Sequence, residues 1–92
     1  DDIVYIEGLK DYVIIRLPED RVITLQTMKS LEEKLPSEKF LRIHRSYIVN
    51  TNRIDAVDGN SIEVTEKGKT QNLPVGKSYR DALQQRVDEN RL

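Results

Sequence analysis

The catalytic potential of this chain can be judged first from its one histidine, His44, which Ser46 follows two residues later. A histidine and a serine within hydrogen-bonding reach can act as base and nucleophile. In an extended strand, however, their side chains would share one face about 7 Å apart, which is long for such a pair. No acid between residues 39 and 53 is available to orient the imidazole, and no glycine-rich turn supplies an oxyanion hole. The sequence therefore predicts that the chain is not an enzyme.

Metal and cofactor sites have equally little support. The chain contains no cysteine, which excludes a disulfide, a thiolate metal site and a thiol nucleophile. One histidine among scattered carboxylates matches no zinc or calcium spacing. We therefore expect no metal, no other cofactor and no small-molecule substrate.

Length and hydropathy describe the scaffold. The 92 residues are enough for one domain with a modest core. No apolar run approaches the roughly 18 residues that a membrane-spanning helix needs, and the absence of cysteine fits a reducing compartment. We expect a soluble, cytoplasmic protein without a membrane partner.

The charge of the chain is nearly balanced but unevenly distributed. The net charge of -1 argues mildly against nucleic acid binding, because DNA-binding domains usually carry a basic excess. Two windows, residues 39–53 and 67–80, nevertheless contain basic residues and no acid. Such windows are consistent either with a basic face or with an ordinary mixed surface.

Alternating apolar residues and turn residues predict a largely β structure around the central run Phe40–Asn50. Residues 7–11, after the first strand, are expected to form a loop. A final helix is predicted from Ser78 to near Asn90. Turns are predicted at residues 18–20, 58–60 and 66–69. The strands predicted outside the central run cover residues 3–6, 12–17, 21–24, 53–57, 61–65 and 70–75.

A short amphipathic helix is predicted between the third of these strands and the central run. Apolar residues recur there at helical spacing, Thr24 or Thr27 can cap the start, and Pro36 ends the pattern. The exposed face carries Glu32 and Glu33, which DNA phosphates would repel. We therefore expect this helix to pack on the sheet and not to enter a DNA groove.

The central run Phe40–Asn50 carries the most specific signal, since its apolar ladder is interrupted by His44, Arg45 and Ser46. This run closely resembles the signature of the LytTR family, the DNA-binding output domain of many bacterial response regulators. Other segments resemble further motifs of that family in the same order: residues 3–8 with Tyr12, residues 28–35 and residues 73–79. The resemblance covers about residues 3–83.

The resemblance implies a mainly β fold, with antiparallel strands in several small stacked sheets, one short internal helix and a C-terminal helix. Residues 1–92 would form a single LytTR-type domain, a fragment of a longer response regulator of a two-component system. The implied function is transcription regulation by sequence-specific binding to double-stranded DNA. The implied partners are paired or repeated DNA sites, a second copy on that DNA and a receiver domain in the parent chain.

The family's base-contacting loops can be carried over residue by residue. Arg45 is expected to read guanine or clamp a phosphate, while its neighbours shape the loop or touch phosphate. Many members have serine and arginine where this chain has Gly76 and Lys77, which puts base readout there in doubt. Tyr12 is expected to be partly buried. The complete set implied to bind DNA is Lys10, Asp11, Tyr12, His44, Arg45, Ser46, Gly76 and Lys77.

A protein-interaction module on the same β scaffold, without DNA readout, is the alternative function. The acidic pI of about 5.8 and the glycine at position 76 favour this reading. Phosphate binding weakens steeply with salt, whereas a protein interface of this kind is not expected to.

Overall fold

Eight short β-strands and two α-helices form the fold in a computed structural model that describes residues 2–90. Residue 1 and residues 91–92, the ends of the expected domain, lie outside this description. The elements are β1 (Tyr5–Gly8), β2 (Val13–Arg16), β3 (Arg21–Thr24), α1 (Met28–Lys34), β4 (Phe40–His44), β5 (Tyr47–Asn50), η1 (Thr51–Arg53), β6 (Ile54–Asp58), β7 (Ser61–Glu66), β8 (Lys69–Pro74), η2 (Lys77–Tyr79) and α2 (Arg80–Asn90), where η marks a 3-10 turn.

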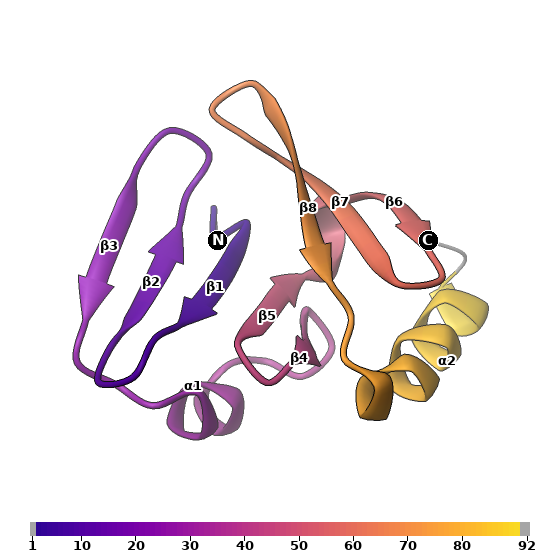
Figure 1. Cartoon of the computed structure of the whole chain (residues 1–92), viewed down its shortest axis with the longest axis horizontal. Helices are drawn as coiled ribbons and strands as arrows, with labels where there is room; N and C mark the ends of the chain where they lie inside the picture. Colours follow the sequence, from indigo (N-terminus) through magenta and orange to yellow (C-terminus); the bar gives the residue numbers. More distant parts are fainter. Residues whose placement is uncertain (1, 91–92) are drawn as a thin grey trace.

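The strands form two antiparallel sheets. The first has the order β3-β2-β1-β5-β4 and the second the order β6-β7-β8. Figure 1 shows the two sheets beside each other, with α1 and α2 at the lower edge of the view. The predicted mainly β fold with an internal and a C-terminal helix is therefore confirmed, and the expected small sheets are these two.

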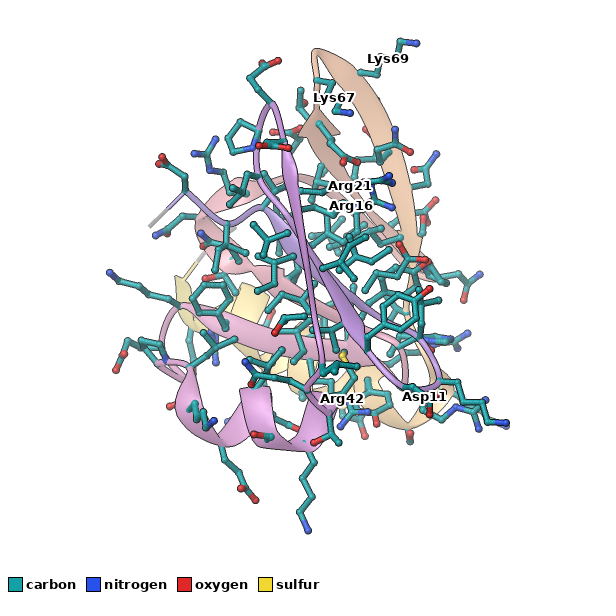
Figure 2. All side chains as sticks on the ribbon, turned by 90° about the vertical axis from the view of Figure 1, so that its left-hand side faces the viewer. Asp11, Arg16, Arg21, Arg42, Lys67 and Lys69 are labelled. Carbon is teal, nitrogen blue, oxygen red and sulfur yellow. The ribbon has the colours of Figure 1, made fainter. Side chains whose placement is uncertain are left out.

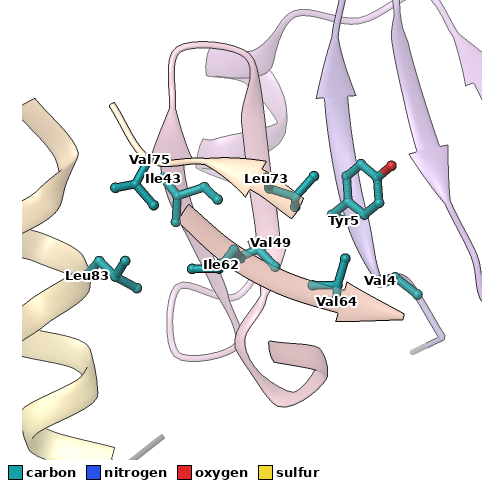
Figure 3. Close-up of a cluster of buried hydrophobic side chains, with 9 residues drawn as sticks. All are labelled: Val4, Tyr5, Ile43, Val49, Ile62, Val64, Leu73, Val75 and Leu83. Atoms are coloured by element: carbon teal, nitrogen blue, oxygen red, sulfur yellow. The ribbon is translucent and has the colours of Figure 1, made fainter. Parts of the chain in front are cut away.

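The main core lies between the sheets, because successive side chains of a strand point to opposite faces. On β1, Tyr5 joins this core, whereas Ile6 joins a second core under α1. Figure 3 shows Leu83 of α2 pointing toward Ile62 of β7, so α2 closes the end of the main core. The buried members of the main core are Val4, Tyr5, Ile43, Val49, Ile62, Val64, Leu73, Val75 and Leu83.

Helix α1 covers the other face of the first sheet, as its apolar stripe predicts. Met28 and Leu31 are buried there, and the Thr27 side chain caps the helix by accepting the amide N–H of Ser30 over 3.0 Å. Gly8 lies in β1, so the loop expected from residue 7 begins too early. A Cβ at Gly8 would stand 2.6 Å from Met28 Cγ, which explains why glycine suits this contact between β1 and α1.

The end of the chain follows the predicted order with small shifts. Pro74 ends β8, an edge strand of the second sheet, where the absence of an N–H does no harm. The final helix begins as the 3-10 turn η2, and regular α-helix starts at Arg80 instead of Ser78. Within residues 2–90, no helix is long and apolar enough to span a membrane.

Candidate nucleic-acid interface

Three segments that are distant in sequence meet at one end of the molecule, the lower edge in Figure 1. The amide N–H of Gly8, at the end of β1, donates to the Ser46 carbonyl oxygen over 2.7 Å, and the Gly76 N–H donates to the Ile43 carbonyl oxygen over 2.8 Å. These bonds fix the β1–β2 loop and the β8–η2 junction beside the β4–β5 turn. The site residues expected from the sequence thus come together, and we call them the loop face: Lys10, Asp11, Tyr12, His44, Arg45, Ser46, Gly76 and Lys77.

The β1–β2 loop is short and closed. The amide N–H of Leu9 donates to the carbonyl oxygen of Tyr12 over 2.8 Å, so Lys10 and Asp11 occupy the exposed tip. Tyr12 is 37% exposed, so it is partly buried, as expected, while the rest of the residue contributes to the loop surface. The loop therefore presents one cation, one carboxylate and one phenol to solvent.

The β4–β5 turn has a different geometry from the extended strand considered above. Arg45 and Ser46 form the turn, and the Ser46 amide N–H donates to Nδ1 of His44 over 3.0 Å. Nδ1 of His44 is thus the acceptor that holds the Ser46 amide in the turn. The separation of about 7 Å in an extended strand therefore does not apply, because the chain reverses between the two residues. Arg45 is exposed at the tip of this turn.

A hollow of about 300 Å³ opens between the β1–β2 loop and the β4–β5 turn. Lys10 and Arg45 come from separate strand connections and line the same opening. Their side chains therefore place two positive charges beside one depression, which favours contact with an anionic partner. The wall of the hollow is completed by Gly8, Leu9, Met28 and Ser46.

The β8–η2 junction explains the departure from the family pattern at position 76. A Cβ added to Gly76 would lie 2.9 Å from Cδ2 of Tyr79, closer than side chains normally approach. Glycine therefore permits the Tyr79 ring to pack against the junction, and η2 begins without a side-chain cap. Lys77, the first residue of η2, is exposed.

Arg42 is a candidate functional residue that the sequence does not single out, because there it is only one charge of the basic window 39–53. Its side chain is just 17% exposed and pairs with Glu32 of α1 over 3.1 Å. Its guanidinium also donates to the carbonyl oxygens of His44 and Arg45. The signal in the sequence was an arginine close to the turn that alternation places on the α1 side of β4.

The second basic window does not form one surface with the first. Lys77 lies at the loop face, whereas Lys67 and Lys69 lie at the opposite end, beside Arg16 (Figure 2). That end contains a second hollow of about 360 Å³, also lined by Tyr5, Glu66 and Gln71. The two windows therefore do not define a single basic face.

The opposite end is held by a charged cluster, the Arg16 cluster, made of Tyr5, Glu7, Arg16 and Glu66. Arg16 pairs with Glu7 over 3.2 Å and with the buried Glu66 over 3.5 Å. The Tyr5 hydroxyl donates to Glu66 Oε1 over 3.1 Å. Burial, and then the negative charge of Glu66, raises the pKa of Tyr5 far above its ordinary value. This cluster ties β1 and β2 to β7.

The chain is thus an antiparallel β domain in which three cation-bearing segments meet at one end. Residues 1–88 match the family model of the LytTr DNA-binding domain. The chain therefore belongs to the LytTR family of DNA-binding domains.

Named relatives agree with this assignment. The sensory transduction protein LytT of Bacillus anthracis is 32% identical over 85 residues, covering 90% of this chain and 35% of that protein. The transcriptional regulatory protein NatR of Bacillus subtilis is 30% identical over 86 residues, covering 90% and 37%. A solved LytTr DNA-binding domain from Bacillus cereus has the same fold, with a TM-score of 0.79, 24% identity and coverage of 94% of this chain and 81% of that one. The chain thus spans about a third of the length of the curated relatives it matches.

Proposed function

We propose that this chain is the sequence-specific DNA-binding output domain of a response regulator and reads the major groove of double-stranded DNA through its loop face. The observation that carries the proposal is the meeting of Lys10, Arg45 and Lys77, from three separate segments, at one end of a LytTR-family domain. Helix α1 is unsuited to the task, because Glu32 and Glu33 are exposed on it and repel phosphates.

Each loop has its own role in this proposal. Arg45 stands at the tip of a turn, where its guanidinium can donate bidentately to guanine O6 and N7. Asp11 can accept from the N4 amino group of cytosine, while Lys10 and Lys77 contact phosphates. His44 and Ser46 hold the turn through their mutual hydrogen bond.

The parent protein is part of the proposal. The named relatives are sensory transduction and transcriptional regulatory proteins about two and a half times as long as this chain. We infer that a receiver domain lies elsewhere in the parent, that phosphorylation of that domain controls binding, and that two copies occupy paired or repeated DNA sites. The site of action would be the bacterial cytoplasm.

Selection from a random duplex library at moderate salt tests the proposal. We expect one motif to be enriched, and we expect Arg45→Ala to weaken binding to that motif by about 1–3 kcal/mol and to relax the preference at one base pair. The measurement is a fluorescence anisotropy titration of the selected and a scrambled duplex. Lys69→Ala, which also removes one positive charge but lies away from the loop face, serves as the control and should leave the preference unchanged.

Two results would contradict this assignment. Retention of full preference by the Arg45 variant would remove Arg45 as the base reader. Failure of the wild-type chain to enrich any motif would favour the protein-interaction alternative.

A further inference from the structure

The guanidinium of Arg42 uses all three of its nitrogens on different acceptors. Nε donates to the carbonyl oxygen of His44 over 3.3 Å, and Nη2 donates to that of Arg45 over 2.6 Å. Nη1 donates to Glu32 Oε1 of α1 over 3.1 Å. Cζ of Arg42 also lies 6.0 Å from the ring centroid of Tyr79 in η2. One side chain therefore links the β4–β5 turn to α1 and to the β8–η2 junction.

The two carbonyl groups that Arg42 binds belong to the peptide units immediately before and after the Cα of Arg45. Fixing both units fixes the direction in which the Arg45 side chain leaves the backbone. The Ser46 N–H bond to His44 Nδ1 and the Gly8 N–H bond to the Ser46 carbonyl oxygen complete the support of the turn. The tip is therefore held from inside while the Arg45 side chain stays exposed.

Arg42 itself is poorly placed to bind DNA. Only 17% of its side chain is exposed, and its charge is balanced by Glu32. Each of its three nitrogens already donates to an acceptor inside the protein, so only two of its five N–H groups remain. A phosphate that took the guanidinium in a bidentate contact would have to compete with these partners.

We propose that Arg42 is a positioning residue for base readout, acting through Arg45, an inference that rests on the proposed DNA-reading function. Its role is to pre-order the turn so that Arg45 meets a base without first losing backbone freedom. Through Glu32, α1 becomes a strut for the loop face. The acidic Glu32 of this helix then supports the β4–β5 turn without contacting DNA.

Arginine is required in this role because of its shape. The planar guanidinium presents donors in a fixed fork that reaches separate acceptors, whereas lysine carries its donors on one atom at the end of a flexible stem. Arg42→Lys keeps the positive charge beside Glu32 but cannot span both carbonyl oxygens and the carboxylate. This substitution therefore separates geometry from charge.

A matched control lies on the same sheet. Arg16 is also a strand arginine with a mostly buried, carboxylate-paired side chain, 20% exposed, but Figure 2 shows it well away from Arg42, between Arg42 and Lys67. Arg16→Lys should disturb stability to a similar extent without touching the β4–β5 turn. Any loss of specificity caused merely by a weaker fold would appear in both variants.

The experiment measures the ratio of dissociation constants for the scrambled and selected duplexes, its salt slope, the thermal midpoint and the backbone order of Arg45 and Ser46 without DNA. In Arg42→Lys we expect the ratio to fall about tenfold with the salt slope unchanged. The order parameters of both amides should drop from about 0.85 toward 0.6. In Arg16→Lys the ratio of dissociation constants and the order parameters should match wild type. On an Arg45→Ala background, Arg42→Lys should change the ratio by less than about twofold, because there is no reader left to position.

Other outcomes overturn the inference. An unchanged ratio or an unchanged order parameter in Arg42→Lys would show that the turn does not depend on this side chain. Equal losses in Arg42→Lys and Arg16→Lys would reduce the effect to stability, and a loss that persists on the Arg45→Ala background would mean that Arg42 contacts DNA itself. If wild type shows no preference for any duplex, the proposed function fails, and the order parameters still decide whether Arg42 holds the turn.

Discussion

The two ends of the first sheet each contain a mostly buried arginine, and they use it differently. At one end, Arg16 is surrounded by the side-chain oxygens of Glu7 and Glu66 and ties the sheets together. At the other end, Arg42 pairs with a single carboxylate, that of Glu32 in α1. Its other two nitrogens donate to backbone carbonyl oxygens of the β4–β5 turn. The contacts of Arg16 join side chains within the protein, whereas those of Arg42 support the backbone of an exposed residue, Arg45.

If the loop face binds DNA as proposed, this difference means that positive charge alone does not locate the interface. Lys67 and Lys69 lie near the Arg16 cluster, on the β7–β8 hairpin. The Lys67 amide N–H donates to the Pro18 carbonyl oxygen over 2.8 Å, which ties this hairpin to the β2–β3 hairpin. Lys10, Arg45 and Lys77 instead belong to connections that meet at the loop face. If the comparison is right, changes at the Arg16 cluster affect stability, and changes at the loop face affect binding.

Arg16→Met should give the largest effect. The substitution leaves Glu66, whose side chain is 8% exposed, without its cation, and we expect a loss of about 3 kcal/mol in the free energy of unfolding because an unpaired buried charge is costly. Urea unfolding followed by circular dichroism measures this loss. Binding to the selected duplex, measured at a temperature where the variant remains folded, should be unchanged.

A double variant separates a loss of DNA binding from a loss of stability. Arg16→Met combined with Glu66→Gln removes the unpaired charge together with the cation, so part of the lost stability should return. A specific loss of DNA preference in this recovered variant would break the comparison, since it would place the Arg16 cluster in the binding surface.

Much of the scaffold could be predicted from the sequence because it depends on local patterns. Alternation in Phe40–Asn50, the apolar stripe of α1 and the stop at Pro36 each involve neighbours in the chain. The sequence placed Gly8 in a loop, however, because a glycine after an apolar run commonly marks a turn. Its actual partner, Met28, lies on another element, and no local pattern records that contact.

The site was predictable to a similar degree and for a similar reason. The resemblance pointed to the loop-face residues, and the structure brings them together. The role of Arg42 depends on the reversal of the chain at Arg45 and on the approach of Glu32 from α1, which are tertiary facts. The separation of Lys67 from Lys77 was likewise hidden, because both residues lie in one acid-free window of the sequence.

A smaller effect is expected from Tyr5→Phe, which sharpens the description of the Arg16 cluster. The change removes the hydroxyl donor to Glu66 and should cost about 1 kcal/mol of unfolding free energy near neutral pH. Loop-face binding should be unaffected. An altered DNA preference in this variant would show that the two ends are coupled.

The pH dependence of stability tests the same contact. Burial and the charge of Glu66 raise the pKa of Tyr5, so the folded state favours the neutral phenol. This contribution is complete below the unfolded pKa of about 10 and is lost as the pH rises above it toward the folded pKa. Unfolding measured between pH 8 and about pH 11 should therefore show a steeper loss in wild type than in Tyr5→Phe. Parallel curves would mean that the pKa of Tyr5 is not raised in the folded state.

The smallest expected effect distinguishes the two halves of the second basic window. Lys77→Ala should weaken binding to the selected and scrambled duplexes alike, by about twofold to fivefold, and lower the salt slope by about 1, because one phosphate contact is lost. Lys69→Ala removes the same charge from the same window and should change neither quantity, because its side chain lies beside the Arg16 cluster. Titrations at several salt concentrations measure both slopes. A lower slope in Lys69→Ala would extend the DNA contact to the far end of the molecule, whereas equal slopes in wild type and Lys77→Ala would remove the β8–η2 junction from the interface.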